Sequence, residues 1–121
     1  MTISNAGPDP MPRRTGTSLG PFVAIGLPQV LAEALAVHRP ILSLDLDMIS
    51  TAGLNELENA IVGCRLLGAQ VDAIEVIARL VAADYRGPLI VVTPPLPNPR
   101  MVERELALVA DGMKVRLIEM S

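Results

Sequence analysis

The uninterrupted aliphatic run Leu89–Thr93 is the sequence feature that most restricts how this chain can fold. It is mostly β-branched, and turn-forming residues bound it, with Gly87-Pro88 before it and Pro94-Pro95 after it. A strand without a polar face is typical of a parallel sheet that is covered on both sides. The chain therefore has to supply helices that pack around this strand.

Segments of helical periodicity alternate with strand-like runs along the chain. The helical segments have roughly the length that a βαβ crossover requires, so we predict a three-layer α/β/α fold with a mostly parallel sheet of 4–5 strands. The expected strands are 22–25, 41–48, 89–93 and 115–118, and the expected helices are 28–38, 51–68, 72–84 and 99–111, with 70–74 as an alternative short strand.

Two of the expected helices have explicit start signals. Asp72 is followed three residues later by Glu75, which resembles a capping box. Asn98 precedes Pro99, and proline is favoured at the first position of a helix. These two boundaries are therefore the best defined.

The N-terminal residues differ in composition from the rest of the chain. Residues 1–20 are rich in Pro, Gly, Ser and Thr and lack apolar periodicity, so we expect a disordered tail. Residues 21–121 are then a single α/β domain, long enough to bury a core.

Composition and charge argue against several classes of function. The only aromatic residues are Phe22 and Tyr85, which leaves no stacking platform for single-stranded nucleic acid, and the formal net charge is −3. Cys64 is the single cysteine, so neither an intramolecular disulfide nor a cysteine metal cage can form. No apolar run reaches the roughly 20 residues of a membrane span. We expect a cytoplasmic protein without nucleic-acid or membrane binding.

The expected strand 41–48 carries the candidate site. Asp45 and Asp47 share one strand face near its carboxyl end, where ligands collect in open α/β sheets. Their carboxylates suit Mg²⁺, so Asp45 and Asp47 are the metal candidates and Mg²⁺ is the one cofactor to consider. Ser50 and Thr51 follow where a helix is expected, as caps or as modifiable hydroxyls. Thr93 lies nearby if the two strands are neighbours.

Residues 23–48, 74–93 and 112–118, about two thirds of the chain, resemble the receiver domains of response regulators. The resemblance implies that Asp45 is the phosphoacceptor position and Thr93 the switch hydroxyl. The segments similar to that family are 23–48, as its second strand, second helix and third strand, and then 74–93 and 112–118, as its later helix and its last strands.

The departures from the receiver pattern concern the charged residues. The pair of metal-binding acids on the first receiver strand is not visible, and Glu119-Met120 stands where a Lys-Pro is expected. Without these groups the charge that develops in phosphoryl transfer is largely unneutralised. The resemblance therefore implies a degenerate receiver that signals by binding.

The central segment, residues about 46–71, resembles STAS domains, as in anti-sigma antagonists and stressosome scaffolds. The residues that carry this likeness are Ser50–Leu54 and Cys64–Val71. It implies that Thr51 is the target of a partner kinase. Ser50 stands where that family has an Asp, and the chain after Val71 departs from the pattern.

The sequence thus favours a non-catalytic signal-transduction module that acts through protein–protein interaction. Its switch region is Asp45, Asp47, Ser50, Thr51 and Thr93, and Asp45 and Thr51 are the phosphoacceptor candidates. The expected partner is a kinase or a sigma-factor regulator, and a homodimer is compatible with the sequence. The alternatives are a STAS-like phosphoswitch and a small Mg²⁺-dependent phosphoryl-transfer enzyme or hydrolase.

Overall fold

The computed structural model describes residues 20–67 and 72–120. The tail predicted for 1–20 lies outside the described residues except for Gly20. In chain order the elements are β2 (Phe22–Ile25), α1 (Gln29–Ala36), β3 (Ile41–Leu44), the 3₁₀ helices η2 (Leu46–Thr51) and η3 (Leu54–Glu56), β4 (Ile61–Arg65), α2 (Ala73–Ala82), β5 (Leu89–Thr93), α3 (Pro99–Val109) and β6 (Val115–Glu119).

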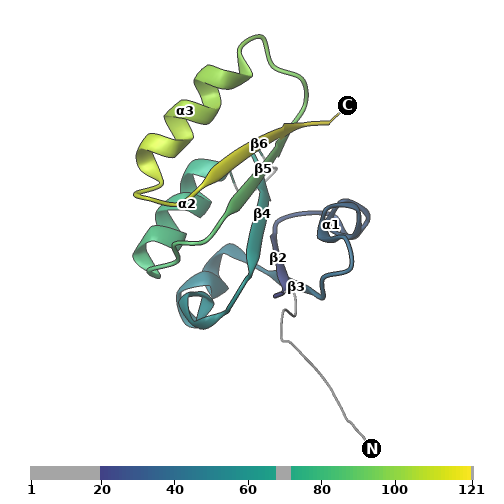
Figure 1. The fold of residues 1–121 in the computed structure, drawn as a ribbon, viewed down its shortest axis with the longest axis vertical. Helices are drawn as coiled ribbons and strands as arrows, with labels where there is room; N and C mark the ends of the chain where they lie inside the picture. Colours follow the sequence, from purple (N-terminus) through teal and green to yellow (C-terminus); the bar gives the residue numbers. More distant parts are fainter. Residues whose placement is uncertain (1–19, 68–71, 121) are drawn as a thin grey trace, which may run out of the picture.

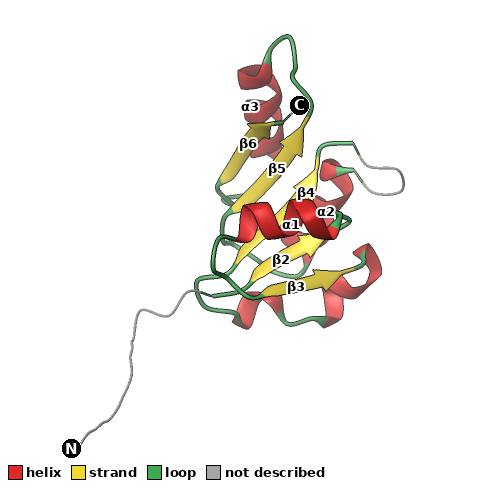
Figure 2. Ribbon diagram, turned by 90° about the vertical axis from the view of Figure 1, so that its right-hand side faces the viewer, coloured by secondary structure: helices red, strands yellow, loops and turns green. Residues whose placement is uncertain are grey.

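The five strands form one parallel sheet in the order β3-β2-β4-β5-β6 (Figure 1). The predicted α/β fold class is confirmed. Because parallel crossovers are right-handed, the direction of each step along the sheet decides which face its connection covers. The step from β2 to β3 runs opposite to all later steps. Consequently α1 lies on one face, while α2 and α3 lie on the other (Figures 1 and 2).

The two faces of the sheet are covered unequally. The larger hydrophobic cluster lies on the side of α2 and α3 and includes Leu54, Val62, Ile77, Leu80 and Leu89. The smaller cluster lies under α1 and consists of Phe22, Ala24, Ala32 and Ala36, with partly buried aliphatic neighbours. Helix α1 contacts β2 and β3, and in Figure 2 it does not extend over β6.

The helix predicted for 51–68 is wrong. Ile61–Arg65 forms the central strand β4, and Leu46–Thr51 and Leu54–Glu56 are short 3₁₀ helices. The helical spacing of Leu54 and Cys64 misled the prediction, because both side chains are buried in the same cluster but reach it from different elements. Strand β3 is also shorter than predicted and ends at Leu44 instead of near Met48.

The helices with start signals form as predicted. The side chain of Asp72 accepts a hydrogen bond from the Glu75 amide at 3.0 Å, and that of Asn98 accepts one from the Met101 amide at 3.2 Å. The alternative strand 70–74 falls partly outside the described residues, and Asp72 forms only an isolated bridge to Leu67. The first helix ends at Ala36, two residues before the predicted end.

We expect Asp72→Ala to lower the free energy of unfolding by about 1 kcal/mol, because α2 loses its N-terminal cap. Urea unfolding followed by circular dichroism measures the change. Glu75→Ala is the matched control, since it removes only the exposed pair with Arg79 and should cost less than about 0.5 kcal/mol. Equal losses in both variants would show that the cap contributes nothing specific.

Candidate functional site

The site residues predicted from the sequence lie at or after the carboxyl ends of the strands. Asp45 directly follows β3, which lies at one edge of the sheet, whereas Thr93 ends β5. Strands β2 and β4 lie between them, so the structure does not bring Asp45 and Thr93 together. The premise that the two strands are neighbours is wrong, because the order depends on a central strand that sequence periodicity did not identify.

Asp45 borders a small cavity at the ends of β2 and β3. The cavity measures about 190 Å³, and Asp45 itself is exposed. Its other lining residues are Ala24, Gly26, Leu27, Ser43, Leu44 and Met48. A lone carboxylate beside apolar walls and one hydroxyl can accept hydrogen bonds from a ligand, but it has no cationic neighbour among these residues.

Asp47 lies in η2 and faces a different element. Its carboxylate is 93% exposed and lies 3.8 Å from the Arg79 guanidinium of α2. The cavity at Asp45 does not include Asp47. Within residues 20–67 and 72–120, no group of three or more His, Cys, Asp or Glu side chains could hold a metal ion. Mg²⁺ binding at Asp45 and Asp47 stays a prediction.

Ser50 and Thr51 are exposed at the end of η2 instead of the start of an α-helix. The hydroxyl of Thr51 donates a long hydrogen bond of 3.4 Å to the Met48 carbonyl. A six-residue 3₁₀ helix that ends at these hydroxyls offers them no positive dipole end. The premise that they begin a helix is therefore wrong, although both side chains are accessible to an enzyme.

Thr93 is buried, with 2% of its surface exposed. Its hydroxyl donates to the Pro94 carbonyl at 2.9 Å, so its hydrogen atom is engaged locally. In this arrangement Thr93 offers almost no surface to a ligand at the carboxyl edge.

The strand count used in the receiver resemblance also changes. Among the described residues, Ile41–Leu44 is the second strand in sequence and Ile61–Arg65 is the third. That strand ends at Arg65, and no acid follows it within the described residues before Asp72. Within residues 20–67 and 72–120, Asp45 therefore follows the second strand in sequence, whereas the receiver resemblance compares it with the end of a third strand.

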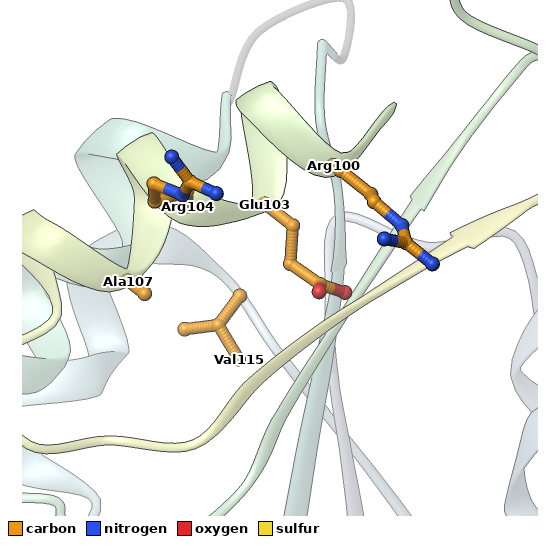
Figure 3. A pocket seen from close by; sticks show the side chains of 5 residues that line it. All are labelled: Arg100, Glu103, Arg104, Ala107 and Val115. Atoms are coloured by element: carbon orange, nitrogen blue, oxygen red, sulfur yellow. The ribbon is translucent and has the colours of Figure 1, made fainter. Parts of the chain in front are cut away.

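A second candidate site lies between α3 and the edge strand β6 (Figure 3). This cavity of about 440 Å³, which we call the α3–β6 groove, is lined by Arg100, Glu103, Arg104, Ala107 and Val115. In Figure 3, Arg100 and Glu103 extend from α3 toward β6. The Glu103 carboxylate accepts a hydrogen bond of 2.7 Å from the Leu117 amide.

This groove was not predicted from the sequence. The spacing of Arg100 and Arg104 by one helical turn was visible, but nothing in the sequence indicated that the last strand lies at an open edge of the sheet. The edge position follows from the strand order, which only the fold reveals.

Cys64 and Tyr85 are buried titratable side chains in the part of the chain that the structure describes. Burial raises the pKa of the Cys64 thiol to about 12, with a smaller contribution from the Asp72 charge. Burial likewise raises the pKa of Tyr85 to about 12. The Tyr85 hydroxyl donates to backbone carbonyls, with an oxygen–oxygen distance of 2.7 Å to Pro88. Neither group is set up as a nucleophile, because the thiolate and the phenolate are both disfavoured.

We expect the protein to lose stability as the pH rises above 9.0, the ordinary pKa of the thiol. In that range the unfolded chain releases the Cys64 proton while the folded chain retains it up to about pH 12, so unfolding becomes easier. Between about pH 7 and pH 10 the loss attributable to Cys64 is about 1 kcal/mol. Urea unfolding at both pH values measures it, and Cys64→Ala should lose less over the same interval.

The fold and the strand order define a class: an α/β domain with a doubly wound, five-stranded parallel sheet. Numbered from the first strand, the order is 2-1-3-4-5, which flavodoxins and receiver domains share. Comparisons with protein families, with curated proteins and with solved structures found no match for this chain. Among the helices of the described residues, none is long and apolar enough to cross a membrane.

Proposed function

We propose that this chain is a cytoplasmic, non-catalytic signalling module of the degenerate receiver type, which acts by binding another protein. The observation that carries the proposal is the surface of α3. This amphipathic helix leaves three large apolar side chains in contact with solvent: Met101 is 55% exposed, Leu108 79% and Val109 49%. Apolar side chains gathered on one exposed element are typical of a contact surface for another protein.

The carboxyl edge supports the non-catalytic part of the proposal. Asp45 and Asp47 contact different neighbours, Thr93 is buried, and the third strand ends at Arg65. Phosphoryl transfer needs positive charge placed around the transferred group together with an acceptor. The described side chains around Asp45 do not supply that arrangement.

The claim that the protein does not accept a phosphoryl group is tested by incubating it with acetyl phosphate and Mg²⁺ and measuring its intact mass. No phosphoryl adduct is expected. An adduct that is lost in Asp45→Asn would contradict the proposal and restore receiver chemistry at Asp45. Asp111→Asn is the matched control, because Asp111 is an exposed acid far along the chain from the site.

The proposed binding of another protein is tested with a photo-crosslinking amino acid placed at Leu108. The control position is Glu33, an exposed residue of α1 on the opposite face of the sheet. A partner is expected to crosslink at Leu108 only. Once purified, that partner should bind Met101→Glu and Leu108→Glu variants at least about tenfold more weakly. Equal crosslinking at both positions, or unchanged binding by the variants, contradicts the proposal.

One observation favours a second candidate, the STAS-like phosphoswitch. The Thr51 side chain is exposed and therefore accessible to a kinase. A phosphothreonine at Thr51 in protein purified from cells, absent from Thr51→Ala but retained in Ser50→Ala, would support this function over the first one.

A further inference from the structure

The outer edge of β6 is unpaired within the described residues, because β6 is the last strand of the sheet. The Lys114 carbonyl accepts from the Leu89 amide, and the Met120 amide donates to the Thr93 carbonyl, both at 2.8 Å. In a strand, the backbone amide and carbonyl of one residue point to one side, and those of the next residue point to the other side. Residues 114 and 120 face β5, so residues 115, 117 and 119 direct their amides and carbonyls away from β5. The edge can therefore accept another strand.

The position of Glu103 identifies one of these outward groups directly. Its carboxylate lies 2.7 Å from the Leu117 amide, so that amide faces the α3–β6 groove and has an anionic acceptor there. Natural sheets protect open edges with charged side chains that prevent uncontrolled pairing. Glu103 protects this one, but it occupies only the middle of the three outward positions.

The groove has the shape that strand addition requires. Its walls are the helix α3 and the edge strand β6, with the small side chain of Ala107 at one end (Figure 3). Domains that bind peptides by strand addition use such a gap between an edge strand and a helix. A volume of about 440 Å³ accommodates a few residues of extended chain.

The charge of the groove indicates which peptide it suits. Arg100 and Arg104 are exposed, and neither forms an ion pair within the part of the chain that the structure describes. The only acid of the lining, Glu103, is already engaged with the Leu117 amide. Guanidinium groups bind carboxylates through paired, charge-assisted hydrogen bonds.

We propose that the α3–β6 groove binds an extended acidic segment of a partner protein, which adds to the sheet as a strand beside β6. The acidic side chains contact Arg100 and Arg104, and a backbone carbonyl of the segment replaces the Glu103 carboxylate at the Leu117 amide. Glu103 thus competes with the partner for the edge. This inference rests on the proposed function, since it names the form of partner that the signalling module recognises.

The test uses the whole chain and a fluorescein-labelled hexapeptide in which Glu and Val alternate. Alternation places the acids on the side of the arginines and the valines beside Ile118, which faces the other side of the sheet. Fluorescence anisotropy is expected to detect saturable binding that weakens as salt is added. A peptide with Lys in place of Glu, and one N-methylated at alternate residues, should each bind at least about tenfold more weakly.

Variants of the protein separate the contributions of the two arginines and of Glu103 to peptide binding. Arg100→Ala combined with Arg104→Ala should weaken binding of the Glu-Val peptide about tenfold. Arg116→Ala is the matched control, because Arg116 carries the same charge on β6, the strand that borders the groove, but faces away from α3. It should leave the affinity within about twofold. Glu103→Ala should strengthen binding at least about threefold, because the competing carboxylate is gone.

Hydrogen exchange distinguishes strand addition from loose electrostatic binding, because only strand addition slows the exchange of backbone amides on β6. The amides of Val115 and Glu119 point outward and should become protected when the peptide is added. Binding without this protection, or binding by the N-methylated peptide, overturns strand addition. Protection that depends on protein concentration without peptide also overturns it, because a second copy then occupies the edge. If a partner crosslinks at Leu108 but the peptide does not bind, only this inference fails and the proposed function stands.

Discussion

Gly63→Ala is expected to lower the free energy of unfolding by about 2–3 kcal/mol. Gly63 lies in the middle of β4, and the ring of Phe22 lies directly over it. A β-carbon at this position would be 3.0 Å from Cε1 of Phe22 and closer still to Cζ. Phe22 has no exposed surface, so its ring cannot move aside without disturbing the cluster under α1.

The sign of this effect decides between two opposing contributions. Alanine reduces the entropy of the unfolded chain and on that account stabilises by up to about 1 kcal/mol. The steric overlap should outweigh this gain, because the space beside Gly63 is filled by a rigid ring. Urea unfolding monitored by circular dichroism measures the net result. A variant as stable as the parent would mean that the cluster under α1 is loosely packed.

A double-mutant cycle provides the control. Phe22→Leu removes the ring atoms above Gly63 at a cost of its own. If overlap with the ring is the cause, Gly63→Ala should cost at least about 1 kcal/mol less in the Phe22→Leu background than in the parent. Additive losses would assign the effect to the strand backbone instead.

Ile49→Ala should lower the free energy of unfolding by about 3 kcal/mol. Ile49 lies in η2 and is completely buried in the larger cluster. Together with Leu54 it fixes the irregular connection between β3 and β4, which has no long helix to anchor it. Removing the side chain leaves a cavity where the connection packs against the sheet.

The preceding residue supplies a matched control for Ile49. Met48 is 46% exposed in the same 3₁₀ helix, and Met48→Ala should change stability by no more than about 0.5 kcal/mol. Equal losses in both variants would contradict the burial of Ile49 as the cause of the effect. Thermal or urea unfolding of both variants decides the matter.

The parts of the fold that the sequence predicted are those with strong local signals. Asp72 and Asn98 satisfy helix amides with their own side chains, and the capped helices begin where these residues stand. The run Leu89–Thr93 is a strand with neighbours on both sides. The caps depend on interactions between residues that lie within a few positions of one another. The apolar run is only five residues long and is bounded by turn-forming residues, which favours a strand over a helix.

The candidate site was predicted less well. The sequence correctly placed Thr93 at the end of its strand, but it grouped Thr93 with Asp45, from which two strands separate it. Spacing along a chain gives no information on which strands become neighbours. The α3–β6 groove was missed for the same reason, since Arg100 and Glu103 acquire their setting only from the edge position of β6.

By itself, the sequence determined that this chain forms a parallel α/β sheet, because aliphatic runs alternate with capped amphipathic helices and no aromatic core or disulfide is available. Only the tertiary structure decided that Ile61–Arg65 is a strand at the centre of that sheet. Its five residues fit a helical pattern locally, and hydrogen bonds to β2 and β5, from distant parts of the chain, favour the extended form. Long-range pairing of this kind set the strand order, and the strand order placed every candidate site.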